Sequence, residues 1–110
     1  MIEGQILNRR PIIMPGAIHQ SAREGNFGAK KPYGPLCDRP DVAVFQTPVL
    51  RNNIEVIGPI SVRLWISSTA PDTDFTAKLL DIYPFSSDYP DGYHMNICEG
   101  IQRARYRGGS

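Results

Sequence analysis

Strict alternation of apolar and polar residues in the middle of the chain is the feature that most restricts its fold. The segment 58–68 reads GPISVRLWISS, and every second residue from Ile60 to Ile66 is aliphatic. Successive side chains of an extended strand point to opposite faces, so this period of two predicts a half-buried β-strand. Ten glycines and ten prolines among 110 residues exclude long helices and favour short strands joined by turns. We therefore expect an all-β protein.

Turn signals divide the second part of the chain into a series of antiparallel strands. Pro90-Asp91-Gly92 predicts a turn, because Pro presets φ and Gly accepts a positive φ. Glu99-Gly100 and Gly58-Pro59 predict bulges in the strands that contain them. The strands are expected at residues 41–47, 54–68, 75–83 and 93–107. A jelly roll needs about eight strands, so these four or five predict an incomplete, jelly-roll-like β-sandwich.

The first 40 residues differ in composition from the rest. Their prolines and glycines are dense enough to exclude a helix of useful length. We interpret residues 1–40 as an irregular linker or arm, and residues 41–110 as the partial jelly-roll β-sandwich domain.

Charge and composition exclude several classes of function. The formal net charge is +1 and the sequence pI is about 7.8, so no overall field favours a nucleic acid or an anionic membrane as partner. No apolar run approaches the ~20 residues of a membrane span, and the N-terminus lacks the apolar core of a signal peptide. We expect a cytoplasmic protein without a cofactor. Cys37 and Cys98 lack metal-ligand spacing; we favour two buried free thiols over one disulfide.

Several phrases of the sequence are similar to those of a known enzyme family. They are RPDVAVFQTPVL at 39–50, APDTDFTAKLLDIYP at 70–84 and ICEGIQRARYR at 97–107. Together they resemble the C-terminal β-domain of the CocE/NonD family of serine hydrolases, which includes cocaine esterases, X-Pro dipeptidyl-peptidases and α-amino acid ester hydrolases. The resemblance covers roughly residues 39–107, and a weaker match reaches back to Gly16. Two apparent insertions, 26–36 and 85–89, lengthen loops.

The resemblance implies a galactose-binding-like jelly-roll domain that accompanies an α/β-hydrolase catalytic domain, in cis or as a separate chain. In the family the Ser-His-Asp triad lies in that catalytic domain. A GxSxG nucleophile elbow is absent from the present sequence, so we assign no catalytic residue to it. We expect an accessory domain that braces the catalytic domain and borders its active site. The alternative is a free-standing carbohydrate- or peptide-binding β-sandwich.

Four side chains are candidates for contacts with substrate or with the catalytic domain. Trp65 points away from the aliphatic face of its strand, and we favour packing on the catalytic domain over stacking on a sugar. Ile12, Ile13 and Met14 precede Pro15-Gly16. The resemblance places such residues near the mouth of the active site, where they would line the substrate pocket; the alternative is a simple tether.

Polar candidates have structural interpretations as well as chemical ones. Asp72 and Asp74, with Asp81, could supply oxygen ligands for Ca²⁺, but we favour hydrogen bonds to backbone amides that fix a loop, and predict no metal site. We therefore predict that Asp72, Asp74, Gly92 and Gly100 maintain the shape of loops. His19, near Ser21, is expected to be an ordinary surface or interface histidine rather than a general base.

The end of the last predicted strand raises two further questions. Its three arginines, Arg103, Arg105 and Arg107, would share one face; we favour ion pairs with acidic neighbours over RNA binding. Its residues 101–107 are also the edge at which unpaired backbone groups would promote self-association.

Overall fold

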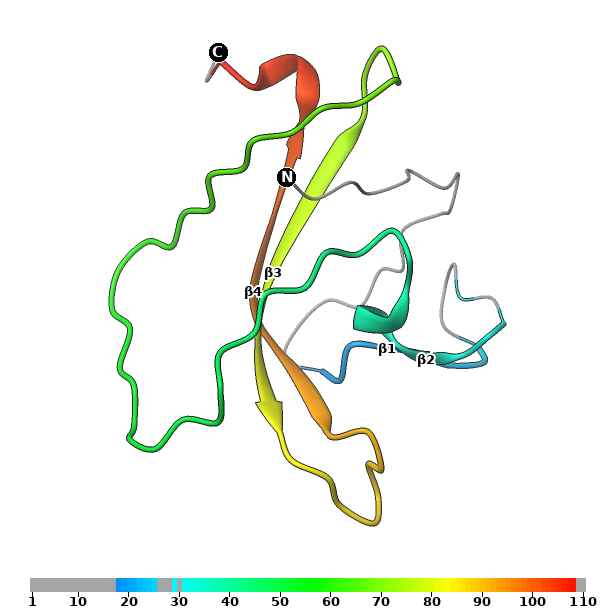
Figure 1. The fold of residues 1–110 in the computed structure, drawn as a ribbon, viewed down its shortest axis with the longest axis vertical. Helices are drawn as coiled ribbons and strands as arrows, with labels where there is room; N and C mark the ends of the chain where they lie inside the picture. Colours follow the sequence, from blue (N-terminus) through cyan, green and yellow to red (C-terminus); the bar gives the residue numbers. More distant parts are fainter. Residues whose placement is uncertain (1–17, 26–28, 30, 109–110) are drawn as a thin grey trace.

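A long antiparallel hairpin is the main element of the computed structural model, which describes residues 18–25, 29 and 31–108. Strand β3 (Asp74–Tyr83) pairs with β4 (Tyr93–Arg103) over their whole length, from Asp74 opposite Arg103 to Tyr83 opposite Tyr93 (Figure 1). The predicted strand at 75–83 and the turn before Tyr93 are confirmed. The backbone N–H and C=O groups of this alternating segment are thus paired in an antiparallel ladder.

The hairpin contains a bulge, but not at the predicted position. The register shifts between Leu79, which faces Cys98, and Leu80, which faces Asn96, so that Ile97 is the extra residue. The prediction of a bulge at Glu99-Gly100 is wrong, because Glu99 faces Lys78 in regular register and the two side chains form an ion pair of 2.8 Å. A glycine in a strand permits a bulge, whereas a cross-strand ion pair favours the regular ladder.

Strand β4 is also paired on its other side, over a short stretch, by the segment that precedes β1. The Gln20 N–H donates to the His94 carbonyl at 2.9 Å, and the Asn96 N–H donates to the Ile18 carbonyl at 3.3 Å. Between them His19 forms an isolated antiparallel bridge with Met95. Two segments more than 70 residues apart in sequence are thereby joined.

Two very short strands and a turn follow this crossing. Strand β1 (Ser21–Ala22) pairs with β2 (Gly34–Pro35), and the 3₁₀ turn η1 (Leu36–Asp38) comes directly after β2. The sequence did not predict them, because two-residue strands fit between prolines and glycines without leaving a periodic pattern. They lie beside the hairpin in Figure 1.

The strands predicted at 41–47 and 54–68 are not formed. Residues 42–71 are all exposed and none belongs to a strand. Figure 1 shows that this segment forms a wide loop beside the hairpin and returns to it where β3 begins. Alternation specifies which side chains share a face, but a strand also needs a neighbour for its N–H and C=O groups. Within the described residues no segment provides that neighbour.

The C-terminal strand is shorter than predicted. Strand β4 ends at Arg103, and the chain turns into the 3₁₀ turn η2 (Ala104–Tyr106), whose first amide donates to the Thr73 carbonyl at 2.8 Å. The prediction that three arginines share one strand face is therefore wrong. The predicted ion pairs are present for two of them: Arg103 pairs with Asp74 and Arg105 with Asp72.

The buried interior of the described residues is small and mostly polar. Ala22 is the buried hydrophobic residue there, with Ala29 and Leu36 packed against it. The buried polar residues lie where the N-terminal segment crosses β4: Gln20, Ser21, His94 and Asn96. Two antiparallel sheets without an α-helix in the described part confirm the all-β class and are consistent with an incomplete β-sandwich.

Among the described residues, no helix is long and apolar enough to cross a membrane.

Gly92 closes the turn between β3 and β4, and its substitution gives a direct test of the turn. Its φ of +80° is strained for other residues, and an added Cβ would lie 2.5 Å from the Tyr83 carbonyl oxygen. We expect Gly92→Ala to lower the free energy of unfolding by about 1–3 kcal/mol in urea denaturation. Gly100→Ala is the control, because a Cβ there meets no atom within 4 Å; equal losses in the two variants would contradict the prediction.

Candidate functional site

The site is built around His19, whose ring lies among aromatic side chains at the turn end of the hairpin. The imidazole stacks on Tyr93 with ring centroids 5.0 Å apart and meets the Tyr89 ring edge-on at 5.3 Å. Tyr89 and Tyr93 also contact each other edge-to-face at 4.8 Å. Tyr89 comes from the turn and Tyr93 is the first residue of β4. His19 comes from residues 18–22, which we call the crossing segment because its residues 18–20 pair with β4. We call His19, Tyr89, Tyr93 and His94 the histidine–tyrosine cluster.

Hydrogen bonds fix the two imidazoles of this cluster differently. His19 Nδ1 accepts the backbone N–H of His94 at 2.9 Å, whereas His94 Nε2 lies 2.9 Å from the Asp91 carbonyl oxygen and donates to it. Burial lowers the pKa of His19, and the positive charge of Arg23 and the neighbouring His94 act in the same direction, against a smaller opposing effect of Asp91. His19 is therefore held as a neutral hydrogen-bond acceptor.

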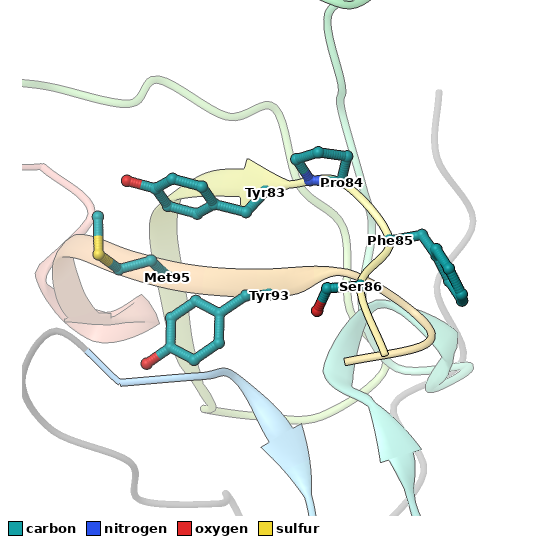
Figure 2. Close-up of a pocket in the computed structure, with 6 residues that line it drawn as sticks. All are labelled: Tyr83, Pro84, Phe85, Ser86, Tyr93 and Met95. Atoms are coloured by element: carbon teal, nitrogen blue, oxygen red, sulfur yellow. The ribbon is translucent and has the colours of Figure 1, made fainter. Parts of the chain in front are cut away.

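An open cavity of about 510 Å³ lies beside the cluster. Figure 2 shows Tyr83, Tyr93 and Met95 on one side of it, while the ring of Phe85 points away from them. The remaining lining residues are Pro84 and Ser86, from the loop after β3. Ser86 Oγ accepts the Tyr89 N–H at 3.1 Å and thus closes the turn. The mostly apolar lining suits contact with an apolar group better than acid–base chemistry.

A second polar group connects the crossing segment to the middle of the hairpin. Gln20 is fully buried, its Oε1 accepts from Lys78 Nζ at 2.7 Å, and its Nε2 donates to the Ile18 carbonyl at 3.1 Å. Lys78 also pairs with Glu99 on the opposite strand at 2.8 Å. The side chain of one lysine thus connects three segments.

The two aspartates singled out in the sequence lie at the other end of the hairpin. Asp72 Oδ1 accepts the backbone N–H groups of Thr73 at 3.0 Å and of Arg105 at 3.1 Å, and its Oδ2 accepts from the Arg105 guanidinium. This hydrogen bonding from Arg105 lowers the pKa of Asp72. Asp74 pairs with Arg103 at 3.0 Å. In the part of the chain that the structure describes, no three His, Cys, Asp or Glu side chains gather as a metal site would require.

The remaining candidates are not brought together. Trp65 is fully exposed in the extended segment, and Gly100 lies within β4. Ile12, Ile13 and Met14 lie outside the described residues. Cys37 and Cys98 are both free thiols, but the prediction that both are buried is wrong, because Cys37 is only partly buried and Cys98 is exposed. Burial and the adjacent Asp38 raise the pKa of Cys37.

The histidine–tyrosine cluster was missed by sequence reasoning, which predicted an ordinary surface or interface histidine at His19 and did not connect it with the tyrosines. Its partners are 70 or more residues away, and nothing in the local pattern shows that residues 18–20 cross β4. The unusual density of tyrosines around Pro90-Asp91-Gly92 was the one available signal.

Comparison with known proteins supplies the family. Residues 17–110 match the X-Pro dipeptidyl-peptidase C-terminal non-catalytic domain. The chain belongs to this family. It is also 49% identical over 73 residues to a cocaine esterase from Rhodococcus sp. (strain MB1 Bresler), a match that covers 66% of this chain and 12% of that protein. No solved structure matches the chain. The predicted resemblance to the CocE/NonD family is thus confirmed.

The contact between Lys78 and Gln20 can be tested by substitution. Lys78→Met keeps the aliphatic stem but removes both the donor to the buried Gln20 and the ion pair with Glu99, so we expect a loss of about 1–3 kcal/mol in the free energy of unfolding. Glu99→Gln removes the ion pair alone. Because the Glu99 side chain is 40% exposed, its loss should be at most about 1 kcal/mol. The free energy of unfolding of both variants is measured by urea denaturation. A larger loss for Glu99→Gln than for Lys78→Met would contradict a stabilising contact between Lys78 and Gln20.

Proposed function

We propose that this chain is part of an accessory β-domain that braces the α/β-hydrolase domain of a CocE/NonD-type serine hydrolase and borders its active site. The observation that carries the proposal is the match of residues 17–110 to a non-catalytic domain of this hydrolase family. The chain spans only 12% of the related cocaine esterase, which leaves room in such a protein for a separate catalytic domain.

The exposed extended segment supports a role in packing. Its large apolar side chains reach solvent throughout, with Val49 exposed to 95%, Ile57 to 86% and Trp65 completely. Soluble monomers rarely leave contiguous apolar patches of more than a few hundred Å² uncovered, and each Å² of apolar surface that is buried contributes about 25 cal/mol. Further strands of the sandwich and the catalytic domain are the cover that we propose for residues 42–71.

The exposure of Trp65 does not specifically support the alternative role as a carbohydrate-binding module. A sugar-binding site presents its aromatic ring beside polar groups that converge on the ligand. Trp65 instead lies between Leu64 and Ile66, which are also exposed. Its exposure is therefore a property of the whole segment, and we assign Trp65 to the interface with the catalytic domain.

The chemistry in this proposal belongs to the catalytic domain. The complete enzyme would cleave an ester or amide bond, such as that of an X-Pro peptide or an α-amino acid ester, through a serine acyl-enzyme. Ile12, Ile13 and Met14 would line one wall of its substrate pocket. Asp72, Asp74, Gly92 and Gly100 would maintain the shape of the domain.

We also propose roles for the two parts of the chain and a cellular location for the protein. Residues 1–40 would act as the arm and residues 41–110 as the sandwich part, in a cytoplasmic protein. The crossing of residues 18–20 over β4 is where the arm would be fastened. Self-association would proceed through the outer edge of β4 at residues 97–103. In the described part of the chain, no strand forms a ladder with this edge on the side away from β3.

The single tryptophan provides the test of the interface. Trp65 fluorescence should have the emission of a hydrated indole in this chain alone and should shift to the blue when the α/β-hydrolase domain encoded with it is added. The catalytic domain should have its own tryptophans replaced by phenylalanine. Trp65→Ala should weaken that association, and Arg51→Ala, in the same exposed segment, is the control.

Other results of the fluorescence experiment have distinct meanings. A blue shift that grows with the concentration of the chain alone would indicate self-association. A shift with oligosaccharides that Trp65→Ala abolishes would favour the carbohydrate-binding alternative. The absence of any coding sequence for a GxSxG-bearing α/β-hydrolase near or within the same gene would contradict the proposed partner.

The assignment of catalysis to another domain predicts that this chain alone hydrolyses neither esters nor amides. With p-nitrophenyl acetate or Gly-Pro p-nitroanilide, we expect release at the rate of the buffer, because no nucleophile elbow is present. Turnover that survives repurification and disappears in Ser21→Ala or His19→Ala would show that the chain has catalytic chemistry of its own.

A further inference from the structure

We propose that His19 is an acid-sensitive latch: its neutral imidazole fastens the crossing segment, residues 18–22, to the turn end of the β3–β4 hairpin, and protonation releases that attachment. This inference goes beyond the proposed function and does not depend on it. It rests on the position of one ring nitrogen and on the groups that surround the ring.

The latch depends on a hydrogen bond that only one protonation state can make. His19 Nδ1 accepts the backbone N–H of His94 at 2.9 Å. An imidazolium carries a proton on both nitrogens and has no acceptor. After protonation the Nδ1–H would point at the His94 N–H, and a donor would face a donor. The backbone amide of a residue that is only 7% exposed would then lose its partner.

The neighbouring groups do not offer a strong replacement for that hydrogen bond. From the segment after β1, Arg23 adds positive charge; it lies over the Tyr89 ring at 5.6 Å. From β4, His94 faces the His19 ring at 5.6 Å, and Tyr93 stacks on it. From the turn, Asp91 is the acidic group that favours protonation, but its effect is smaller than those of burial, Arg23 and His94.

The other imidazole of the cluster makes a contact that does not depend on its protonation state. His94 donates from Nε2 to the Asp91 carbonyl, a contact that both the neutral and the protonated ring can make. His19 is thus the member of the cluster whose contact requires the neutral form.

The sign of the pH dependence follows from linkage. The pKa of His19 in the folded chain lies below its ordinary value of 6.5, so in this range the unfolded chain binds more protons than the folded one. Stability that depends on His19 is complete above about pH 6.5 and is lost as the pH falls toward the lower, folded-state pKa. The attachment of residues 18–22 should loosen within this window.

The same opening would reach the cavity. Met95, which lines it, forms the backbone bridge with His19, and Tyr93, which also lines it, stacks on the His19 ring. Release of the latch therefore removes support from one wall of the 510 Å³ cavity. Acid would therefore change the shape of that cavity through the His19 contact.

Amide exchange measured by NMR on the whole chain tests the latch. We expect the protection factor of the His94 amide, corrected for the intrinsic pH dependence of exchange, to fall about fivefold between about pH 7.5 and pH 5, as the loss of one net hydrogen bond predicts. The amide of Leu79, which faces Cys98 in the hairpin, is the internal reference and should not change in this way.

Two variants separate titration from structure. His19→Asn places an uncharged amide oxygen near the position of Nδ1, so the His94 amide should keep its protection at both pH values. His94→Gln preserves a donor toward the Asp91 carbonyl and removes the other imidazole, so the fall should persist in it, observed at the backbone amide of the substituted residue. If His19→Asn does not fold, the ¹⁵N shifts of His19 in the unaltered chain decide. A protonated Nδ1 at neutral pH, or an acid transition in which the His94 amide is unaffected, would overturn the latch.

Discussion

Backbone pairing on both sides of β4 is the constraint on which the described structure depends. On one side β4 forms its long ladder with β3, and on the other it pairs with residues 18–20 over a few residues. The first is a local contact across one turn. The second closes a loop of more than 70 residues, and the ordering entropy of that closure must be offset by what gathers at the crossing. His19, Gln20 and their partners provide those contacts.

The crossing explains why the buried groups are polar. Gln20 donates its backbone N–H to the His94 carbonyl, accepts the Leu36 N–H at its own carbonyl, and accepts from Lys78 at its side-chain oxygen. Buried polar groups are tolerated when they are hydrogen-bonded, and their directional bonds determine register as apolar contacts do not. Apolar burial is nearly missing at the same place: Ala22 is the buried hydrophobic residue of the described part. Most of the exposed large apolar side chains lie instead in residues 42–71, without cover in the described part of the chain.

This separation accounts for how much the sequence could predict. The hairpin was predictable, because its alternation and the Pro90-Asp91-Gly92 turn are local signals that its own two strands satisfy. Residues 54–68 carry an equally clear alternation, yet they form no strand, because a pattern identifies a face and does not supply the neighbour. The histidine–tyrosine cluster could not be predicted, since it depends on a contact between His19 and residues near 94. The family, in contrast, could be predicted, because several continuous stretches of the sequence are similar to those of the family.

The alternation of residues 60–66 still needs a physical reason, and family membership suggests one. Four aliphatic residues at a spacing of two are an improbable arrangement for a segment that stays in water, where exposed apolar area brings no stability. Such a pattern is useful only if one face is buried and the backbone is paired. We therefore propose that residues 42–71 are a strand-forming segment whose partner would be another part of such a hydrolase. The hairpin and its polar crossing, in contrast, pair their backbone groups with one another. A backbone-paired element joined to an uncovered apolar segment is the physical basis for regarding the chain as part of an accessory domain.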